Sequence, residues 1–346
     1  MNSNTISVSI DTVHISITDM YMDVRDLWAN NWRYDPDAKA TVFRKNITAA
    51  HGAAHGANVH FDFYPASQTL VVQFSAPKVL YGTNAIAFDS DQYEMVENEI
   101  LDLVFGETGF WVHPSQMMVT RIDLNRDFVF ETEDEASAMM TFAKKILPYR
   151  GEVRKDYKNG FTSLTKKGNG FRVYYKHKEA KELALLPTVR FEFQMRRRCL
   201  TRLFGYRPTL HQILTVSLSE LDKVWDALMS RYGLEQKIVS RKGLDRIART
   251  LTPVQRETLY RMNDCPSFTD KRERRKQQAI IRIMRRLGFC AYSCELPLTM
   301  IFDVCDLIMT TEKRMKKCYT ANYSHIYIPQ AASRDIPQRK WYLDSS

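Results

Sequence analysis

The sequence predicts an α+β fold: a domain built on an antiparallel sheet (residues 1–235), a smaller all-helical domain (236–320) and an irregular tail (321–346). Two observations carry this prediction. Segments with alternating apolar and polar residues recur through the first two-thirds of the chain, and short turn-like segments join several of them, which indicates antiparallel strands. From about Leu218 onward the apolar residues recur instead at helical spacing. The tail contains few apolar residues, so no packed element is expected there.

The expected elements follow from these two periods. Strands are expected at Ile6–Ile17, Val59–Tyr64, Thr69–Phe74, Met118–Phe130, Phe161–Thr165, Phe171–Lys178 and Thr188–Arg196. Helices are expected at Gln92–Val104, Glu133–Ile146, Leu218–Tyr232, Arg241–Thr250, Pro253–Met262, Thr269–Leu287 and Pro297–Met309. Residues 65–68 and 166–170 have the composition of hairpin turns, so the strands that flank each turn are expected to pair. Thr132 and Glu135 have the spacing of a capping box at a helix start.

The composition favours a folded protein with a polyanionic partner. Lys and Arg number 50 against 40 Asp and Glu, which gives a formal charge of +10. A cationic surface attracts phosphate groups, so this charge is typical of nucleic-acid-binding proteins without being specific to them. A hydrophobic content of 44% excludes an intrinsically disordered chain. No signal peptide and no apolar run of about 18 residues is found, so we expect a soluble, cytoplasmic protein and no membrane contact.

Cysteine and histidine give no convincing metal motif. Among the six cysteines only Cys290 and Cys294 lie close together, and one such pair is a poor zinc signature, so buried free thiols are expected. His51, His55 and His60 would bind a metal only if the first two lay on a helix. A glycine follows each of those two histidines, and glycine disfavours a helix.

Three of the expected strands each have one apolar and one charged face, because residues two apart in a strand share a face. The charged faces carry Arg121, Asp123, Asn125 and Asp127; then Arg172, Tyr174, Lys176 and Lys178; then Arg190, Glu192, Gln194 and Arg196. An ordinary amphipathic sheet with a solvated outer side is one interpretation. If the strands are neighbours, the alternative is a cluster of carboxylates beside a tyrosine and a lysine. Such carboxylates suit Mg2+ or Mn2+, and the combination is suited to phosphoryl transfer.

Several short segments, in a fixed order, match a known family. They are SAPKVLYGTNAIAF (Ser75–Phe88), TRIDLNRDF (Thr120–Phe128), VYYKHKE (Val173–Glu179), VRFEFQMR (Val189–Arg196) and, in the helical region, RRLGF (Arg285–Phe289). On these segments, over roughly residues 60 to 325, the chain resembles the gene II/X replication initiators of filamentous phages and their plasmid relatives. The family forms of the first four read approximately S-x-P-K-x-L-x-G-x-N, R-I-D, Y-x-K-x-x-E and R-x-E. Residues 1–55 lie outside the resemblance.

The resemblance implies a nicking endonuclease that starts rolling-circle replication in the cytoplasm of a host cell. Such an initiator cleaves one strand at an origin, leaves a 5′-phosphotyrosine and a free 3′-hydroxyl, and later rejoins the strand. Its partners would be origin DNA, both duplex and single-stranded, with a host polymerase and helicase. The family's nucleophile is the tyrosine of Y-x-K, here Tyr174, and its lysine is Lys176. Alternation independently favours Tyr174 over Tyr175, which falls on the apolar face.

The resemblance also gives roles to the charged face. The expected ligands of Mg2+ or Mn2+ are Asp123 and Glu192, helped by Asp127. Lys176 is expected to favour the phenolate or to neutralise the transition state. Arg121 or Arg190 is expected either to clamp a phosphate oxygen or to pair with a neighbouring acid. The chain lacks the His-hydrophobic-His metal motif of many nicking initiators, which favours a carboxylate-based site.

A basic helix is expected in the C-terminal domain. Residues 271–287 contain eight basic residues and one acid. Ile280, Ile283, Met284 and Leu287 form the apolar stripe, and Arg275, Arg282 and Arg286 lie opposite it. Beside a DNA-cleaving domain, this pattern predicts a helix that contacts DNA phosphates or the major groove, although a solvated basic face gives the same pattern.

Two other functions are compatible with these features. One is a metal-dependent DNA endonuclease that uses water and forms no covalent intermediate. The other is a non-catalytic origin-binding protein in which the acidic cluster is structural. The sequence does not determine the oligomeric state.

Overall fold

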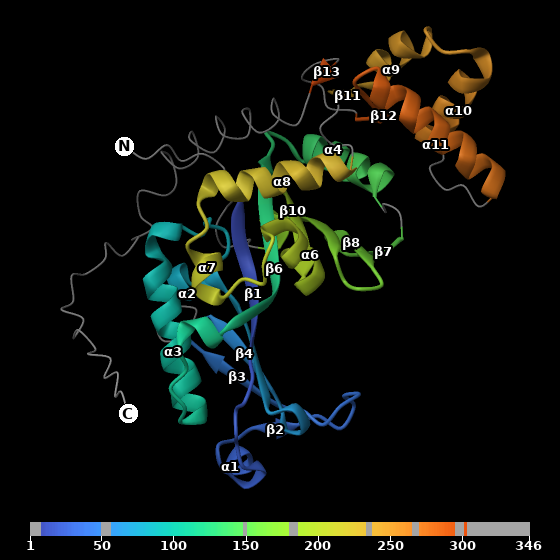
Figure 1. Ribbon diagram of the computed structural model, residues 1–346. Coiled ribbons are helices and arrows are strands. Elements are labelled where there is room, and N and C mark those ends of the chain that lie inside the picture. The colour runs from blue at the N-terminus through green and yellow to red at the C-terminus, as the bar shows by residue number, and fades with distance from the viewer. Residues whose placement is uncertain are drawn as a thin grey trace.

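A large antiparallel sheet and its helices form most of the chain (Figure 1). The computed structural model describes residues 8–49, 57–147, 151–179, 186–232, 237–264, 270–294 and 301–302. Within these ranges the structure confirms the α+β class and the antiparallel sheet. The predicted boundary near residue 235, the tail 321–346, His51 and His55 lie outside the described residues.

The sheet has ten strands in the order β2-β3-β4-β5-β1-β6-β10-β9-β8-β7, and every neighbouring pair is antiparallel. The strands are β1 (Ser9–Ile17), β2 (Arg33–Tyr34), β3 (Phe43–Thr48), β4 (Asn58–Tyr64), β5 (Thr69–Ser75), β6 (Met118–Val129), β7 (Glu152–Tyr157), β8 (Gly160–Thr165), β9 (Gly170–Tyr175) and β10 (Thr188–Arg196). Both predicted hairpins are present, β4 with β5 and β8 with β9. Gly168 takes a φ of 74° in the second turn, a conformation that favours glycine.

Two predictions about strands were wrong or incomplete. The strand predicted to reach Lys178 ends at Tyr175, and the next four residues form the short helix α5 (Lys176–Glu179). Strands β2, β3 and β7 were not predicted. Strand β7 lies at one edge of the sheet. Its sequence, EVRKDY, is almost wholly polar and five of its six residues are exposed, as is common for an edge strand, so it has no apolar alternation to detect.

Helices cover the apolar side of the central strands. The helices of this part are α1 (Val24–Ala29), α2 (Ala76–Tyr81), α3 (Tyr93–Thr108), α4 (Glu133–Ile146), α5, α6 (Arg197–Phe204), α7 (Leu210–Leu214) and α8 (Leu218–Tyr232), with 3-10 turns η1 (Pro65–Ser67), η2 (Ser90–Gln92) and η3 (Pro114–Gln116). Thr132 caps α4 as predicted and accepts a bond from the Glu135 amide at 3.2 Å. The Glu135 carboxylate accepts from the Glu131 amide at 2.8 Å.

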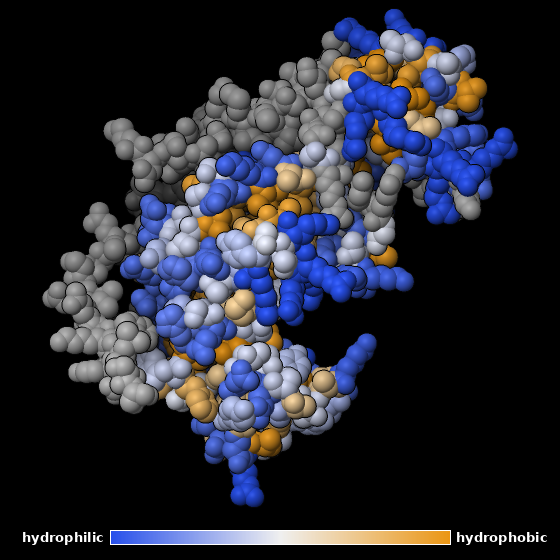
Figure 2. All heavy atoms as spheres, viewed as in Figure 1, coloured by the Kyte–Doolittle hydropathy of each residue, from blue (hydrophilic) through white to orange (hydrophobic). Residues whose placement is uncertain are grey.

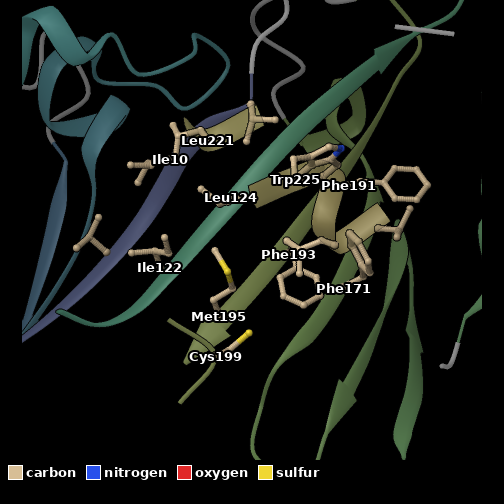
Figure 3. Close-up of a cluster of buried hydrophobic side chains, with 14 of the residues drawn as sticks. Ile10, Ile122, Leu124, Phe171, Phe191, Phe193, Met195, Cys199, Leu221 and Trp225 are labelled. Atoms are coloured by element: carbon tan, nitrogen blue, oxygen red, sulfur yellow. The ribbon is translucent and has the colours of Figure 1, made fainter. Parts of the chain in front are cut away.

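The core lies between the central strands and α8 (Figure 3). Phe171 packs edge-on against Phe193, with ring centroids 4.8 Å apart, and against Trp225 of α8, at 6.2 Å. Phe191 and Met195 belong to the same cluster. The apolar faces predicted for β9 and β10 are therefore the faces buried against helices, and the charged faces point to the other side of the sheet.

The C-terminal module (residues 237–294 and 301–302) was predicted to be all-helical, and this prediction was wrong because the module also contains short strands. It contains β11 (Lys237–Val239), α9 (Arg241–Ala248), α10 (Pro253–Asp264), α11 (Lys271–Arg286), β12 (Phe289–Ser293) and β13 (Ile301–Phe302), whose strands pair in the order β12-β11-β13. The helix predicted at 297–309 is contradicted at residues 301–302, and its remainder lies outside the described residues. Strands of two to five residues, mostly apolar, are too short to show a period of two.

The C-terminal module contacts α4 through β12. Lys145 of α4 donates to the Ser293 carbonyl at 3.4 Å, and the Cys294 thiol lies 3.7 Å from the Ala138 carbonyl. Cys199, Cys290 and Cys294 are buried free thiols, as predicted, and the other three cysteines lie outside the described residues. Among the helices that the structure describes, none is long and apolar enough to cross a membrane.

Candidate active site

The three charged faces form one surface, because β6, β10 and β9 are neighbours in the sheet. Arg190 of β10 lies opposite Asp127 of β6 and opposite Tyr174 of β9. The surface is buried: Asp123 is 0% exposed and Glu192 4%. The interpretation as a solvated outer face is therefore wrong, since a solvated face would leave its charges in water. We call this surface the charged face.

Tyr174 is hydrogen-bonded to a carboxylate on the charged face. Its side chain is 8% exposed, and its hydroxyl donates to Glu192 Oε2 at 3.1 Å. Burial, together with repulsion from the carboxylates of Asp123 and Asp11, raises the pKa of Glu192 to about 8. Burial and the Glu192 carboxylate raise the pKa of Tyr174 well above the ordinary value. Glu192 thus accepts a hydrogen bond from a buried phenol whose ionisation is disfavoured.

Arg190 is held beside Tyr174 by an ion pair with Asp127. Its Nε lies 2.6 Å from Asp127 Oδ1 and its Nη2 lies 2.7 Å from Oδ2, a bidentate pair. Attraction between Arg190 and Tyr174 favours the phenolate and partly opposes the effect of burial. The third nitrogen, Nη1, is buried, lies 3.6 Å from Asp11 Oδ2 and has no hydrogen-bond partner among the described residues. Arg190 therefore both pairs with an acid, as one alternative predicted, and keeps one unused donor.

The predicted metal ligands are not gathered into a ligand set. Arg121 binds both oxygens of Asp123, with Nε at 2.8 Å, and Arg190 binds both oxygens of Asp127. Glu192 accepts from Arg172 at 3.2 Å as well as from Tyr174. Within the described ranges, no group of three or more His, Cys, Asp and Glu side chains is arranged to hold a metal ion. The set Asp123, Glu192 and Asp127 does not fit Mg2+ or Mn2+ in this arrangement, and we derive no chemical step through a metal.

Asp11 of β1 is a member of the site that sequence reasoning missed. It is 3% exposed, its Oδ1 accepts from the Ser75 hydroxyl at 2.6 Å, and its Oδ2 accepts from the Asn84 amide at 3.1 Å. A shift in the β1–β6 register lies beside it, between Ile10 and Val13, so simple alternation does not assign its face. A signal was available: Ser75 and Asn84 both lie in the first segment that resembles the replication initiators.

Lys176 lies next to the site rather than on strand β9. It is the first residue of α5 and is 1% exposed. Its ammonium donates to Asn84 Oδ1 and, at 2.7 Å, to Glu179 Oε2. Burial and the nearby Arg190 guanidinium lower the pKa of Lys176. Asn84 therefore links the lysine to Asp11, because its amide group bonds both.

The remaining predicted residues lie away from Tyr174. Tyr175 packs against the hydrophobic core with the Lys178 ammonium 4.3 Å above its ring, as expected for the apolar face. Lys178 pairs with Glu133 at 3.1 Å, on the α4 side, and not with the charged face. His60 is exposed on β4 and bonds Asn46.

Helix α11 has the predicted amphipathic character. Ile280 and Met284 are buried, whereas Leu287, at the C-cap, is 45% exposed. Arg275, Arg282 and Arg286 are exposed, as the pattern predicted. Figure 2 shows strongly hydrophilic side chains over part of the C-terminal module, which is the part labelled α9 to α11 in Figure 1.

Comparison with known proteins gives no match to a family model and no match to a curated protein. The case for a function therefore rests on the residues described above.

Proposed function

We propose that the chain cleaves one strand of DNA with Tyr174 as the nucleophile and initiates rolling-circle replication. The observation that carries the proposal is the hydrogen bond from the Tyr174 hydroxyl to Glu192 Oε2, at 3.1 Å on a buried face. A nucleophile bonded to a carboxylate that can take its proton is one arrangement that activates a residue for covalent catalysis. The resemblance to the replication initiators independently selects the same tyrosine.

The proposed reaction exchanges one phosphodiester for another. Tyr174 Oη bonds to phosphorus, the bond from phosphorus to the 3′ oxygen breaks, and the phenol proton passes to Glu192. The departing 3′ oxygen takes a proton from solvent and becomes a hydroxyl, and the 5′ phosphate stays on the tyrosine. In rejoining, the 3′ oxygen bonds to phosphorus and its hydroxyl proton passes to solvent, the bond from phosphorus to Tyr174 Oη breaks, and Glu192 returns its proton to Tyr174.

Positive charge beside the tyrosine supports this chemistry. The unused Nη1 donor of Arg190 is suited to a non-bridging oxygen whose negative charge increases in the transition state. Lys176 adds a second cation, held in place by Asn84 and Glu179. Because the site is buried, each charge acts in surroundings less polar than water and has a larger effect there.

Dependence on Mg2+ or Mn2+ stays a prediction, drawn from the resemblance. Asp11, Asp123 and Glu192 repel one another, which raises the pKa of Asp123 and of Glu192 beyond the effect of burial, and added positive charge would relieve that repulsion. The arginines now pair with these acids and would have to move. Activity is therefore to be measured with each metal and with EDTA.

We propose that duplex DNA binds to the exposed basic side of α11. Arg275, Arg282 and Arg286 lie on it, and Ile280 and Met284 fix the helix to the module. Contacts from several arginines to phosphates would hold origin DNA near the cleaving domain, in the cytoplasm of a host cell, where a polymerase and a helicase would act on the product.

The test is covalent capture of DNA. The full-length protein is incubated with Mg2+ or Mn2+ and a labelled random-sequence single-stranded library, denatured in detergent, and the DNA that remains attached is sequenced. An oligonucleotide carrying the recovered site then serves as substrate on denaturing gels. Tyr174→Phe must abolish the adduct, and Tyr175→Phe, the adjacent tyrosine on the core side, must retain it.

The other functions give different results. Cleavage without an adduct would identify the hydrolytic endonuclease. Specific binding of duplex or single-stranded DNA without any cleavage would identify the non-catalytic origin-binding protein. Either result rejects Tyr174 as the nucleophile.

A further inference from the structure

A second group of cations lies on the charged face beside the Tyr174 site, and no step of the proposed reaction uses it. Arg121 of β6, Arg172 of β9 and Arg196 of β10 lie on the same side of the sheet as His14 of β1, and we call these four residues the arginine cluster. His14 lies opposite Arg121 in the β1–β6 register, and all three arginines lie close enough to His14 to lower its pKa electrostatically. Arg196 and Arg121 lie directly opposite each other in the β10–β6 register.

The arginine cluster has more cations than anions. Arg121 is neutralised by Asp123, and Arg172 shares Glu192 with Tyr174. Arg196 forms no ion pair with any residue that the structure describes. Burial and the guanidiniums of Arg121 and Arg172 act on it unfavourably, and attraction to Asp123 offsets these effects only in part. Like charges held together are unfavourable unless an anion joins them. The arrangement therefore favours an anionic ligand.

The cluster also contains polar atoms that await a partner. Arg172 Nε and His14 Nε2 are buried and, within the described ranges, have no hydrogen-bond partner. A buried polar atom without a bond costs free energy, so such atoms in a native site call for a partner, which a ligand or an ordered water can supply. The cluster is open to solvent on one side, since Arg196 is exposed and the Arg172 side chain is 39% exposed. A ligand can therefore reach the outer parts of the Arg172 and Arg196 side chains.

The cluster is connected to the nucleophile. Arg172 and Tyr174 are two residues apart on one face of β9, which separates them by about 7 Å along the strand. That spacing is close to the separation of neighbouring phosphates in an extended DNA strand. Figure 2 shows a hollow in the surface between the part around α6 and β8 and the tip that carries α1 and β2, with hydrophilic side chains along the side nearer α6.

We propose that Arg172, Arg196 and His14 bind a phosphodiester of the single DNA strand whose neighbouring phosphate reaches Tyr174. Arg172 Nε and His14 Nε2 supply hydrogen bonds, and Arg196 supplies the unneutralised charge. The identity of the anion as DNA rests on the proposed function. The presence of an anion subsite rests only on the cluster itself.

The test measures the affinity of the full-length protein for a fluorescent 20-nucleotide oligothymidylate as salt is varied, by anisotropy. Each phosphate contact adds about 0.7 to the slope of log affinity against log salt for a single strand. Arg172→Gln with Arg196→Gln removes the contact to one phosphodiester and should therefore lower the slope by about 0.7, which corresponds to roughly 5-fold weaker binding at 0.1 M salt. Arg25→Gln with Arg33→Gln, two exposed arginines at the α1 and β2 tip, should leave the slope unchanged.

Every result decides between the alternatives. An unchanged slope in the double variant overturns the inference, as does a loss that occurs only with a 20-base-pair duplex. If the double variant does not fold, Arg196→Gln alone, at an exposed strand end, should lower the slope by about 0.7. If the wild-type protein fails to capture DNA covalently but the double variant has a lowered slope, the nicking function is rejected and the anion subsite is retained. If the wild-type protein captures DNA but the slope of the double variant is unchanged, the anion subsite is rejected and the nicking function is retained.

Discussion

Replacement of Glu192 by Gln removes the proton acceptor of Tyr174 and keeps the size of the side chain. At pH 8 a phenol with an ordinary pKa near 10 is only about 1% ionised. In the variant the Glu192 charge no longer acts on Tyr174, but burial still raises the pKa of the phenol and lowers the ionised fraction further. Without an acceptor the cleavage rate should therefore fall by at least about 100-fold, within the range typical of general base catalysis.

The pH profile gives the sign of the effect. Glu192 accepts a proton only when it is ionised, and its pKa is raised to about 8. The wild-type single-turnover rate of adduct formation should therefore rise with pH through about 8 and level off above it. Glu192→Gln should lose this midpoint. The assay is the covalent adduct measured on denaturing gels from pH 6 to 9.5.

As pH rises, the stability of the folded protein should change in the direction opposite to the cleavage rate. Between the ordinary value of 4.5 and about 8, the folded protein keeps a proton on Glu192 that the unfolded chain has lost. Wild-type stability thus falls as pH rises through this window, and the Glu192→Gln variant should lack that fall. Thermal unfolding of both proteins at pH 6 and pH 9 measures the difference.

A matched control is available on the other side of the sheet. Glu152 is also buried and accepts a bond from a tyrosine, Tyr232, and from Ser163 at 2.7 Å. Glu152→Gln should leave the cleavage rate within about twofold of wild type, because no proton transfer is assigned to it. A Glu192→Gln rate within about threefold of wild type at pH 8, or a wild-type rate that is flat from pH 6 to 9, would refute the reasoning.

Three further predictions concern stability and binding. Phe171→Ala should lower the free energy of unfolding by about 3–5 kcal/mol in urea titrations, because Phe171 is 0% exposed between β10 and α8; a loss below about 1 kcal/mol would contradict the packing. Asp127→Asn should cost about 3 kcal/mol, since it leaves Arg190 buried without its bidentate partner, and a neutral outcome in the same titration would argue against that pair. The triple variant Arg275→Gln, Arg282→Gln and Arg286→Gln should reduce the salt slope for duplex DNA by up to about 2.7 without changing the melting temperature; an unchanged slope would remove α11 from the duplex contact.

Most of the long elements could be predicted from the sequence. Strand β10 and helices α4 and α8 begin and end at the predicted residues, because nine to fifteen residues with a clear apolar period specify both the element and its buried side. The short strands of the C-terminal module, the two-residue strand β2 and the mostly polar strands β3 and β7 were missed, since none of them has an apolar period long enough to detect. Lys176 was placed on a strand because the polar alternation continues past Tyr175, although the backbone turns into α5 there.

Some features of the candidate site could likewise be predicted from the sequence, and others could not. Alternation within one strand determined that Tyr174 and Arg172 share a face, that Glu192 and Arg190 share another, and that Tyr175 faces the core, since these are properties of the local backbone. Only the tertiary structure decided that these faces adjoin, that Glu192 bonds the tyrosine, and that Asp11 joins them. Partner strands come from distant parts of the chain, and their register is fixed by packing of the whole sheet. Burial of the charged face is likewise a property of the assembled fold, and it gives the Tyr174–Glu192 pair its shifted pKa values.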